Sequence, residues 1–239
     1  MPRSIATGRG VVGQRNLIFD VPYSIEFDGI NDYMTVLDSA SLNAACGAGQ
    51  ARSFGFWIHT YERGNKVIME KGSNMLHVGA QTIAQGFAMG VQGSVANNIN
   101  PIVDGVNVWH HLVCTMDSGS TGTVYMDGAF INSEAGWTGL ADNNENLQFG
   151  RTTGQVFAGT LTLPFVYNRD LTADEILVMY QDNIYPTSGL QMLLGMAEGS
   201  GATVADLSGN GNTGTLTGAL WSTDVPRKLR GIAGVRGVV

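Results

Sequence analysis

The sequence predicts an all-β protein, a sandwich of two antiparallel sheets with one short helix near residues 172–181. Short runs of alternating apolar and polar residues recur from residue 23 to 167, each bounded by Gly, Asn or Asp. Glycine is abundant, at 33 of 239 residues, without a Gly-X-Y repeat. This composition is expected when many tight turns join short strands.

The alternating runs place the expected strands in order along the chain. Residues 53–60 carry bulk on both faces, with Phe56 on one and Trp57 on the other, which predicts a central strand. The other strands are expected at 24–27, 33–37, 66–70, 87–91, 109–116, 123–126, 129–131, 147–150, 159–167, 190–194 and 215–221.

Two local signals fix the connections more sharply. Asp127-Gly128 lies between two strand runs and predicts a two-residue hairpin, because both positions tolerate a positive φ. Thr172 followed three residues later by Glu175 is a capping box, which predicts a helix of two to three turns beginning there.

Charge divides the chain into an acidic body (23–222) between an N-terminal arm (1–22) and a C-terminal arm (223–239). Seven basic residues near the ends leave 6 basic against 20 acidic residues between them. We expect the arms to dock on the body or on a partner, since such asymmetry is typical of interacting tails. The predicted anchoring residues are Arg3, Arg9, Arg15, Arg227, Lys228, Arg230 and Arg236.

The sequence also predicts where the protein works. Residues 1–14 lack the apolar run of a secretory signal, and no stretch has the length of a membrane span. Cys114 lies in an apolar strand run and is interpreted, like most lone cysteines, as a small core residue; Cys46 is the other cysteine. We expect a protein without membrane partners, located on a virion surface or outside cells.

Four segments, in order, resemble one family. They are Ser24-Ile-Glu-Phe-Asp-Gly-Ile-Asn-Asp-Tyr-Met-Thr-Val36, Val108-Trp-His-His-Leu-Val-Cys-Thr-Met-Asp117, Val124-Tyr-Met-Asp-Gly128 and the stretch 157–176. They are similar to the laminin G-like jelly-roll domain of the concanavalin A-like lectin/glucanase superfamily. The resemblance covers most of residues 23–181 and implies a jelly-roll sandwich.

Two features depart from that family. Thr160 stands where the family usually has an acidic residue. Residues 197–216 resemble the family's opening strands but come last, so the order looks circularly permuted. Residues 190–222 are expected to fold back into their own sandwich, the alternative being that they complete a neighbour's.

Enzymatic residues are not evident. A retaining glycosidase needs two carboxylates about 5–5.5 Å apart, and no strand carries an alternating acidic run. His110 and His111 are adjacent and so point to opposite faces, while His59 and His77 stand alone. Three acidic pairs are interpreted as turn and cap residues: Asp28 with Asp32, Asp142 with Glu145, and Asp174 with Glu175.

A structural calcium ion is the one cofactor considered. Asp206, Ser208 and Asn210 have the spacing of the first half of an EF-hand loop, but the Glu of its twelfth position is absent. The resemblance also implies such an ion. The alternative is a Gly-rich turn held by its own side-chain hydrogen bonds.

Three functions are weighed, and the sequence favours the first. The first is a decoration, cement or fibre protein of a bacteriophage capsid, which would form oligomers or bind the major capsid protein through its basic arms. The second is a lectin-like carbohydrate-binding module with Trp137 or Tyr61 stacking on a glycan. The third, a glycoside hydrolase, is disfavoured by the lack of paired carboxylates. Nucleic acid is not expected, since the body is acidic.

Overall fold

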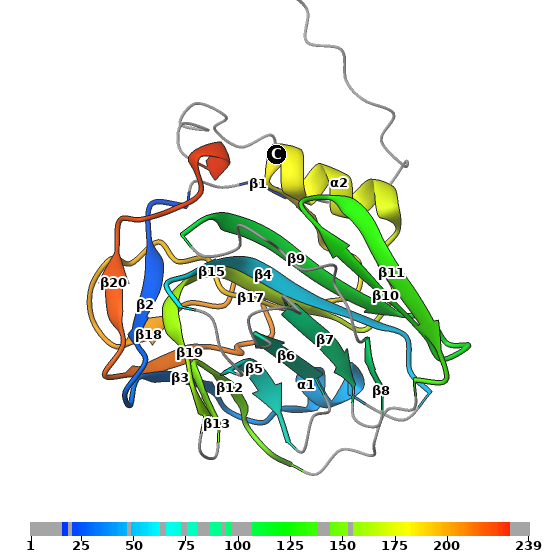
Figure 1. Cartoon of the computed structure of the whole chain (residues 1–239), viewed down its shortest axis with the longest axis horizontal. Helices are drawn as coiled ribbons and strands as arrows, with labels where there is room; N and C mark the ends of the chain where they lie inside the picture. Colours follow the sequence, from blue (N-terminus) through cyan, green and yellow to red (C-terminus); the bar gives the residue numbers. More distant parts are fainter. Residues whose placement is uncertain are drawn as a thin grey trace, which may run out of the picture.

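Two eight-stranded antiparallel sheets pack face to face in the computed structural model (Figure 1). The structure describes residues 16–18, 21–46, 49–62, 66–72, 76–80, 87–91, 94–96, 107–137, 144–152 and 155–229. None of the helices in these ranges is long and apolar enough to cross a membrane. The predicted fold class is confirmed.

The first sheet has the order β11 (Ala129–Ala135), β10 (Thr121–Met126), β9 (Trp109–Met116), β4 (Arg52–Thr60), β15 (Ala158–Tyr167), β2 (Ser24–Asp28) and β20 (Leu220–Ser222), with β17 (Leu190–Leu193) also paired to β15. The second has the order β18 (Thr203–Val204), β19 (Gly214–Thr217), β3 (Tyr33–Val36), β12 (Leu147–Phe149), β5 (Lys66–Lys71), β6 (Leu76–Ala80), β7 (Phe87–Val91) and β8 (Ser94–Ala96). Two short pairs complete the strands, β1 (Asn16–Ile18) with β16 (Ile184–Pro186) and β13 (Arg151–Thr152) with β14 (Gln155–Val156).

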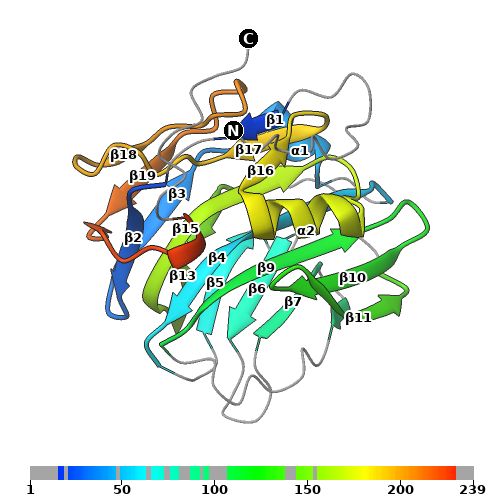
Figure 2. The ribbon, with the colours of Figure 1, turned by 90° about the horizontal axis from the view of Figure 1, so that it is seen from above.

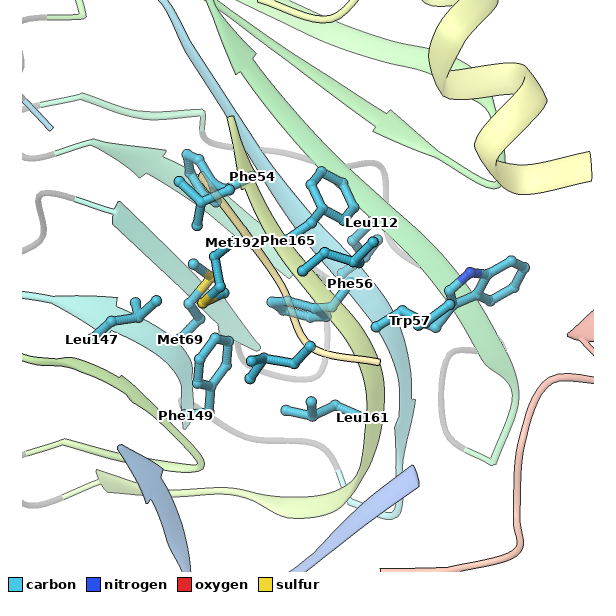
Figure 3. Close-up of a cluster of buried hydrophobic side chains, with 14 of the residues drawn as sticks. Phe54, Phe56, Trp57, Met69, Leu112, Leu147, Phe149, Leu161, Phe165 and Met192 are labelled. Atoms are coloured by element: carbon cyan, nitrogen blue, oxygen red, sulfur yellow. The ribbon is translucent and has the colours of Figure 1, made fainter. Parts of the chain in front are cut away.

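The core lies between the two sheets. Phe56 and Leu161 of the first sheet point toward Met69 and Phe149 of the second, and all four are fully buried. Figure 3 shows Trp57 on the other side of β4, pointing away from this cluster. The period-2 pattern of β4 therefore gives the first sheet one face for the core and one outer face.

The local signals are confirmed. Asp127 and Gly128 have positive φ values of 53° and 78° and join β10 to β11. Thr172 and Glu175 form the capping box of helix α2 (Ala173–Asp182). Glu175 also receives two hydrogen bonds from the guanidinium of Arg169, at 2.9 and 2.7 Å, so the helix start is fastened to the end of β15.

One predicted strand is wrong, and one helix was not predicted. Residues 215–221 do not form one strand, because the chain passes at Gly218 (φ 77°) from β19 in the second sheet to β20 in the first. The additional helix is α1 (Ala40–Ala44), a single turn in which the Ser39 hydroxyl accepts a hydrogen bond from the Leu42 N–H.

Both predicted arms contribute to the packed body. β1 pairs with β16, and Val21 is buried. After residue 222, Val225 and Leu229 are buried, the latter in the short 3₁₀ helix η1 (Arg227–Leu229). The body therefore extends beyond its predicted limits of 23 and 222. Residues 190–222 pair within the chain's own sheets, through β17 with β15, β19 with β3 and β20 with β2.

Helix α2 and η1 cover part of the outer face of the first sheet (Figure 2). Under this cover, Trp57 and the fully buried His111 lie opposite one another on β4 and β9, with Tyr180 of α2 stacked on Trp57 at 5.5 Å between ring centroids. The Lys228 ammonium of η1 lies 3.5 Å above the centre of the Tyr180 ring. Burial lowers the pKa of His111 to about 3.

The close contact of Gly122 with Trp137 gives the first prediction. A β-carbon added at Gly122 would lie 2.1 Å from the buried Trp137 ring. Gly122→Ala should lower the free energy of unfolding by about 1–3 kcal/mol, because the ring cannot move without opening the core. Chemical denaturation measures this. Gly119→Ala, whose nearest neighbour would be an Asp117 side-chain oxygen at 3.3 Å, is the control, and an equal effect of both changes would contradict the packing argument.

The buried His111 predicts acid sensitivity. Its pKa is depressed in the folded chain, so the unfolded chain binds a proton that the folded chain excludes as pH falls from 6.5 toward 3. Over this window the unfolding free energy of the wild-type protein should fall relative to that of His111→Phe by up to about 1.4 kcal/mol per pH unit. Denaturant titrations at several pH values measure the difference. Parallel curves for the two proteins would rule out this contribution.

Candidate functional site

Five strands of the first sheet each place one side chain in a line across the outer face. Residues directly opposite each other in antiparallel strands point to the same side of a sheet. His59 lies two residues from the outward-pointing Trp57, so the line faces outward. This outer row consists of Leu220 (β20), Glu26 (β2), Thr160 (β15), His59 (β4) and Trp109 (β9).

Tyr61 extends the outer row beyond the end of β4. The residue is 37% exposed, and its ring meets the His59 ring edge-on, with centroids 5.3 Å apart. Its hydroxyl donates a hydrogen bond to Glu26 Oε1 at 3.3 Å. Burial, and then the Glu26 charge, raises the pKa of Tyr61 to about 12, so the phenol stays protonated at neutral pH.

Asp224 bounds the other side of the outer row. Its Oδ2 lies 2.7 Å from His59 Nδ1, and its Oδ1 accepts a hydrogen bond from Trp109 Nε1 at 3.3 Å. The Asp224 carbonyl accepts a hydrogen bond from the Ser24 hydroxyl at 2.5 Å. Sequence reasoning missed this contact because 165 residues separate His59 from Asp224, and no local pattern marks the pair.

Together these groups can bind a ligand that has both an apolar and a polar side. The His59 ring lies between Tyr61 and Trp109, the latter at 5.4 Å between centroids, so three rings are contiguous. Leu220 adds an exposed aliphatic side chain at one end of the row. The carboxylates of Glu26 and Asp224 flank the rings and accept hydrogen bonds.

The structure separates the two predicted stacking residues. Tyr61 belongs to the candidate site, whereas Trp137 has 0% exposure, and its ring lies against Gly122. The prediction of an exposed Trp137 is therefore wrong. Its context Ala-Gly-Trp-Thr-Gly suggested a loop, but the backbone continues beside β10, where the Trp137 N–H donates to the Ser120 carbonyl at 2.9 Å, and the ring packs in the core over Gly122.

The loop predicted to hold calcium uses its oxygens within the chain. Asp206 Oδ1 accepts hydrogen bonds from the backbone N–H groups of Leu193 and Ser208, and Oδ2 accepts from the N–H of Asn212. The amide of Asn210 donates to the Gln191 carbonyl at 3.0 Å. These bonds fasten the loop to β17. The described residues contain no group of three or more His, Cys, Asp or Glu side chains placed to hold a metal ion, and the calcium site stays a prediction.

Two of the three acidic pairs have the turn and cap roles expected of them. Asp32 Oδ2 accepts from the Asp28 N–H at 2.9 Å, and Asp28 Oδ1 accepts from the Ile30 N–H, so this pair holds the turn after β2. Glu175 serves the helix cap. Asp142 lies outside the described residues.

The predicted anchoring residues are only partly within the described chain. Arg227 and Lys228 are exposed on η1, where Lys228 contacts Tyr180. The other five, Arg3, Arg9, Arg15, Arg230 and Arg236, lie outside the described residues.

Comparison with known proteins agrees with this architecture. The family model described as the concanavalin A-like lectin/glucanases superfamily matches residues 28–177. A search among curated proteins gives no match. A candidate carbohydrate binding protein from Bacteroides ovatus ATCC 8483 has 15% identity and a TM-score of 0.67, over 85% of this chain and 60% of that one. This chain therefore spans less than two thirds of that protein's length.

Two further solved structures share the fold. The SAP-like pentraxin from Limulus polyphemus, a heptamer, has 13% identity and a TM-score of 0.55, over 82% of this chain and 94% of that one. The binding domain of botulinum neurotoxin serotype G has 16% identity and a TM-score of 0.50, over 71% and 46%. At these identities, the likeness establishes the fold and nothing further.

Proposed function

This chain belongs to the concanavalin A-like lectin/glucanases superfamily, and from that premise we propose that it is a non-catalytic carbohydrate-binding module. The observation that carries the proposal is the outer row with Tyr61 and Asp224. A sugar ring presents C–H groups on its faces and hydroxyls around its edge. Aromatic rings suit the faces, and carboxylates suit the hydroxyls.

The geometry favours binding over hydrolysis. Glu26 is hydrogen-bonded to Tyr61, and Asp224 is engaged with His59 and Trp109, so both carboxylates hold neighbouring side chains in place. Thr160, where the family usually has an acidic residue, lies buried in the middle of the row. The Bacteroides relative, named for carbohydrate binding, is consistent with the same role.

The Tyr61 ring gives the test of this function. Tyr61→Ala should weaken binding of an oligosaccharide identified on a glycan array by about 5- to 30-fold, or roughly 1–2 kcal/mol, because the exposed stacking surface is lost. Isothermal titration calorimetry measures the affinity. Phe130→Ala is the matched control, since Phe130 is 60% exposed on β11 and lies outside the outer row. An array without a hit, or equal losses for both variants, would contradict the proposal.

A second candidate function is assembly, most concretely as a decoration, cement or fibre protein of a bacteriophage capsid. The observation that favours it is the position of the terminal segments. β1 and η1 both lie on the side of the molecule that carries α2 (Figures 1 and 2), where β1 is paired to β16 and η1 contacts Tyr180. Arms that start from fixed points on one side can engage one partner surface.

Native mass tests the assembly function. Light scattering should give a mass above the 25.4 kDa of one chain, and replacement of the seven basic arm residues by Ser should return it to the mass of a single chain. Arg151→Ser, which changes an exposed arginine outside the arms, is the control and should leave the mass unchanged. A monomer at all concentrations that binds no particle would exclude this role.

A further inference from the structure

We infer that the outer row prefers a saccharide carrying a protonated amine, an amino sugar, over neutral or acidic sugars. This inference rests on the proposed carbohydrate-binding function and specifies its ligand class. It follows from the charges around the exposed rings and from the chemistry of an ammonium group beside an aromatic face.

The candidate site is acidic by composition. Its seven residues, the outer row with Tyr61 and Asp224, include two carboxylates and neither Lys nor Arg. Both carboxylates act on the same point, because the Glu26 and Asp224 charges each contribute to the raised pKa of the Tyr61 hydroxyl. The potential at the exposed edge of Tyr61 is therefore negative, and it attracts a cation and repels a sugar carboxylate.

Glu26 is placed to receive that cation. It lies between Leu220 and Thr160 in the row and is half-buried, so water screens its charge less than that of a fully exposed side chain. Its Oε1 accepts from the Tyr61 hydroxyl, which holds the carboxylate beside the ring. An ammonium group that reaches this carboxylate makes a charge-assisted hydrogen bond, whereas a neutral hydroxyl makes an ordinary one.

The rings add to the preference. A cation within about 6 Å of an aromatic centroid is attracted by the negative face of the ring. Within the described part of the chain this interaction occurs at three tyrosines, with Lys228 on Tyr180, Arg151 on Tyr33 and Arg169 on Tyr167, at 3.5, 5.0 and 5.5 Å. Unlike these three, the Tyr61 side chain contacts His59, Glu26 and Thr160 among the described residues, and it offers its exposed surface to a cation from a ligand.

The experiment compares three trisaccharides by isothermal titration calorimetry on the full chain at about pH 6, where a sugar amine is protonated. They are the glucosamine trimer, its fully N-acetylated form and a trimer of galacturonic acid. The glucosamine trimer should bind at least tenfold more tightly than the acetylated form, and the galacturonate trimer more weakly than both. Glu26→Gln should reduce the preference for the free amine about tenfold, and Glu26→Asp should retain most of it.

Glu70→Gln is the matched control, because it removes the same charge from β5 of the other sheet. Unchanged melting temperatures show that the variants are folded. Equal binding of the free and acetylated trimers overturns this inference and leaves the proposed function standing. Equal losses in Glu26→Gln and Glu70→Gln also overturn it, since the amine is then attracted by the acidic body as a whole. Failure of all three trimers and of a wider glycan array overturns the proposed function itself.

Discussion

The register of β4 against its two neighbours is the constraint on which both faces of the first sheet depend. β4 is hydrogen-bonded to β9 on one side and to β15 on the other, so its register is fixed by two neighbouring strands. Side chains alternate with a period of two, and a slip of one residue would exchange the faces. Phe56 would then leave the core, and His59 would enter it. The core and the outer row are therefore two consequences of one pairing pattern.

Helix α2 covers one part of the outer face of the first sheet and leaves another part exposed. Under α2, Trp57 and His111 are buried, and the pKa of His111 is depressed because burial disfavours its charged form more than the Asp127 carboxylate stabilises it. One row further along β4, the cover ends, and Tyr61 keeps an exposed ring. Chemically similar aromatic and histidine residues thus serve packing in one place and are open to a ligand in the next. The difference lies in the helix above them and is absent from the strand pattern itself.

Features decided by neighbouring residues could be predicted from the sequence, and features that depend on packing between distant elements could not. The Asp127-Gly128 hairpin and the Thr172–Glu175 cap were predictable because each is decided within four residues. The fold class was predictable because alternation recurs along the chain. Trp137 was misplaced because its burial depends on Gly122, on a neighbouring strand. The outer row was not predictable, because it requires the register of five strands drawn from residues 26 to 220.

The segment after β20 connects the last strands of the chain to the candidate site. Ser222, at the end of β20, lies opposite Ser24, at the start of β2. In the order that the resemblance implies for the family, the opening strands lead into the strand equivalent to β2, so a turn would have to join these two positions. In this chain β20 follows β2 in the sequence, so the residues after Ser222 do not have to form that turn. Two residues later its carbonyl accepts a hydrogen bond from Ser24, and the Asp224 carboxylate reaches His59 and Trp109. Because β20 follows β2 in this chain and pairs with it, the residues after Ser222 are available to bring Asp224 to the outer row, while pairing within both sheets is kept.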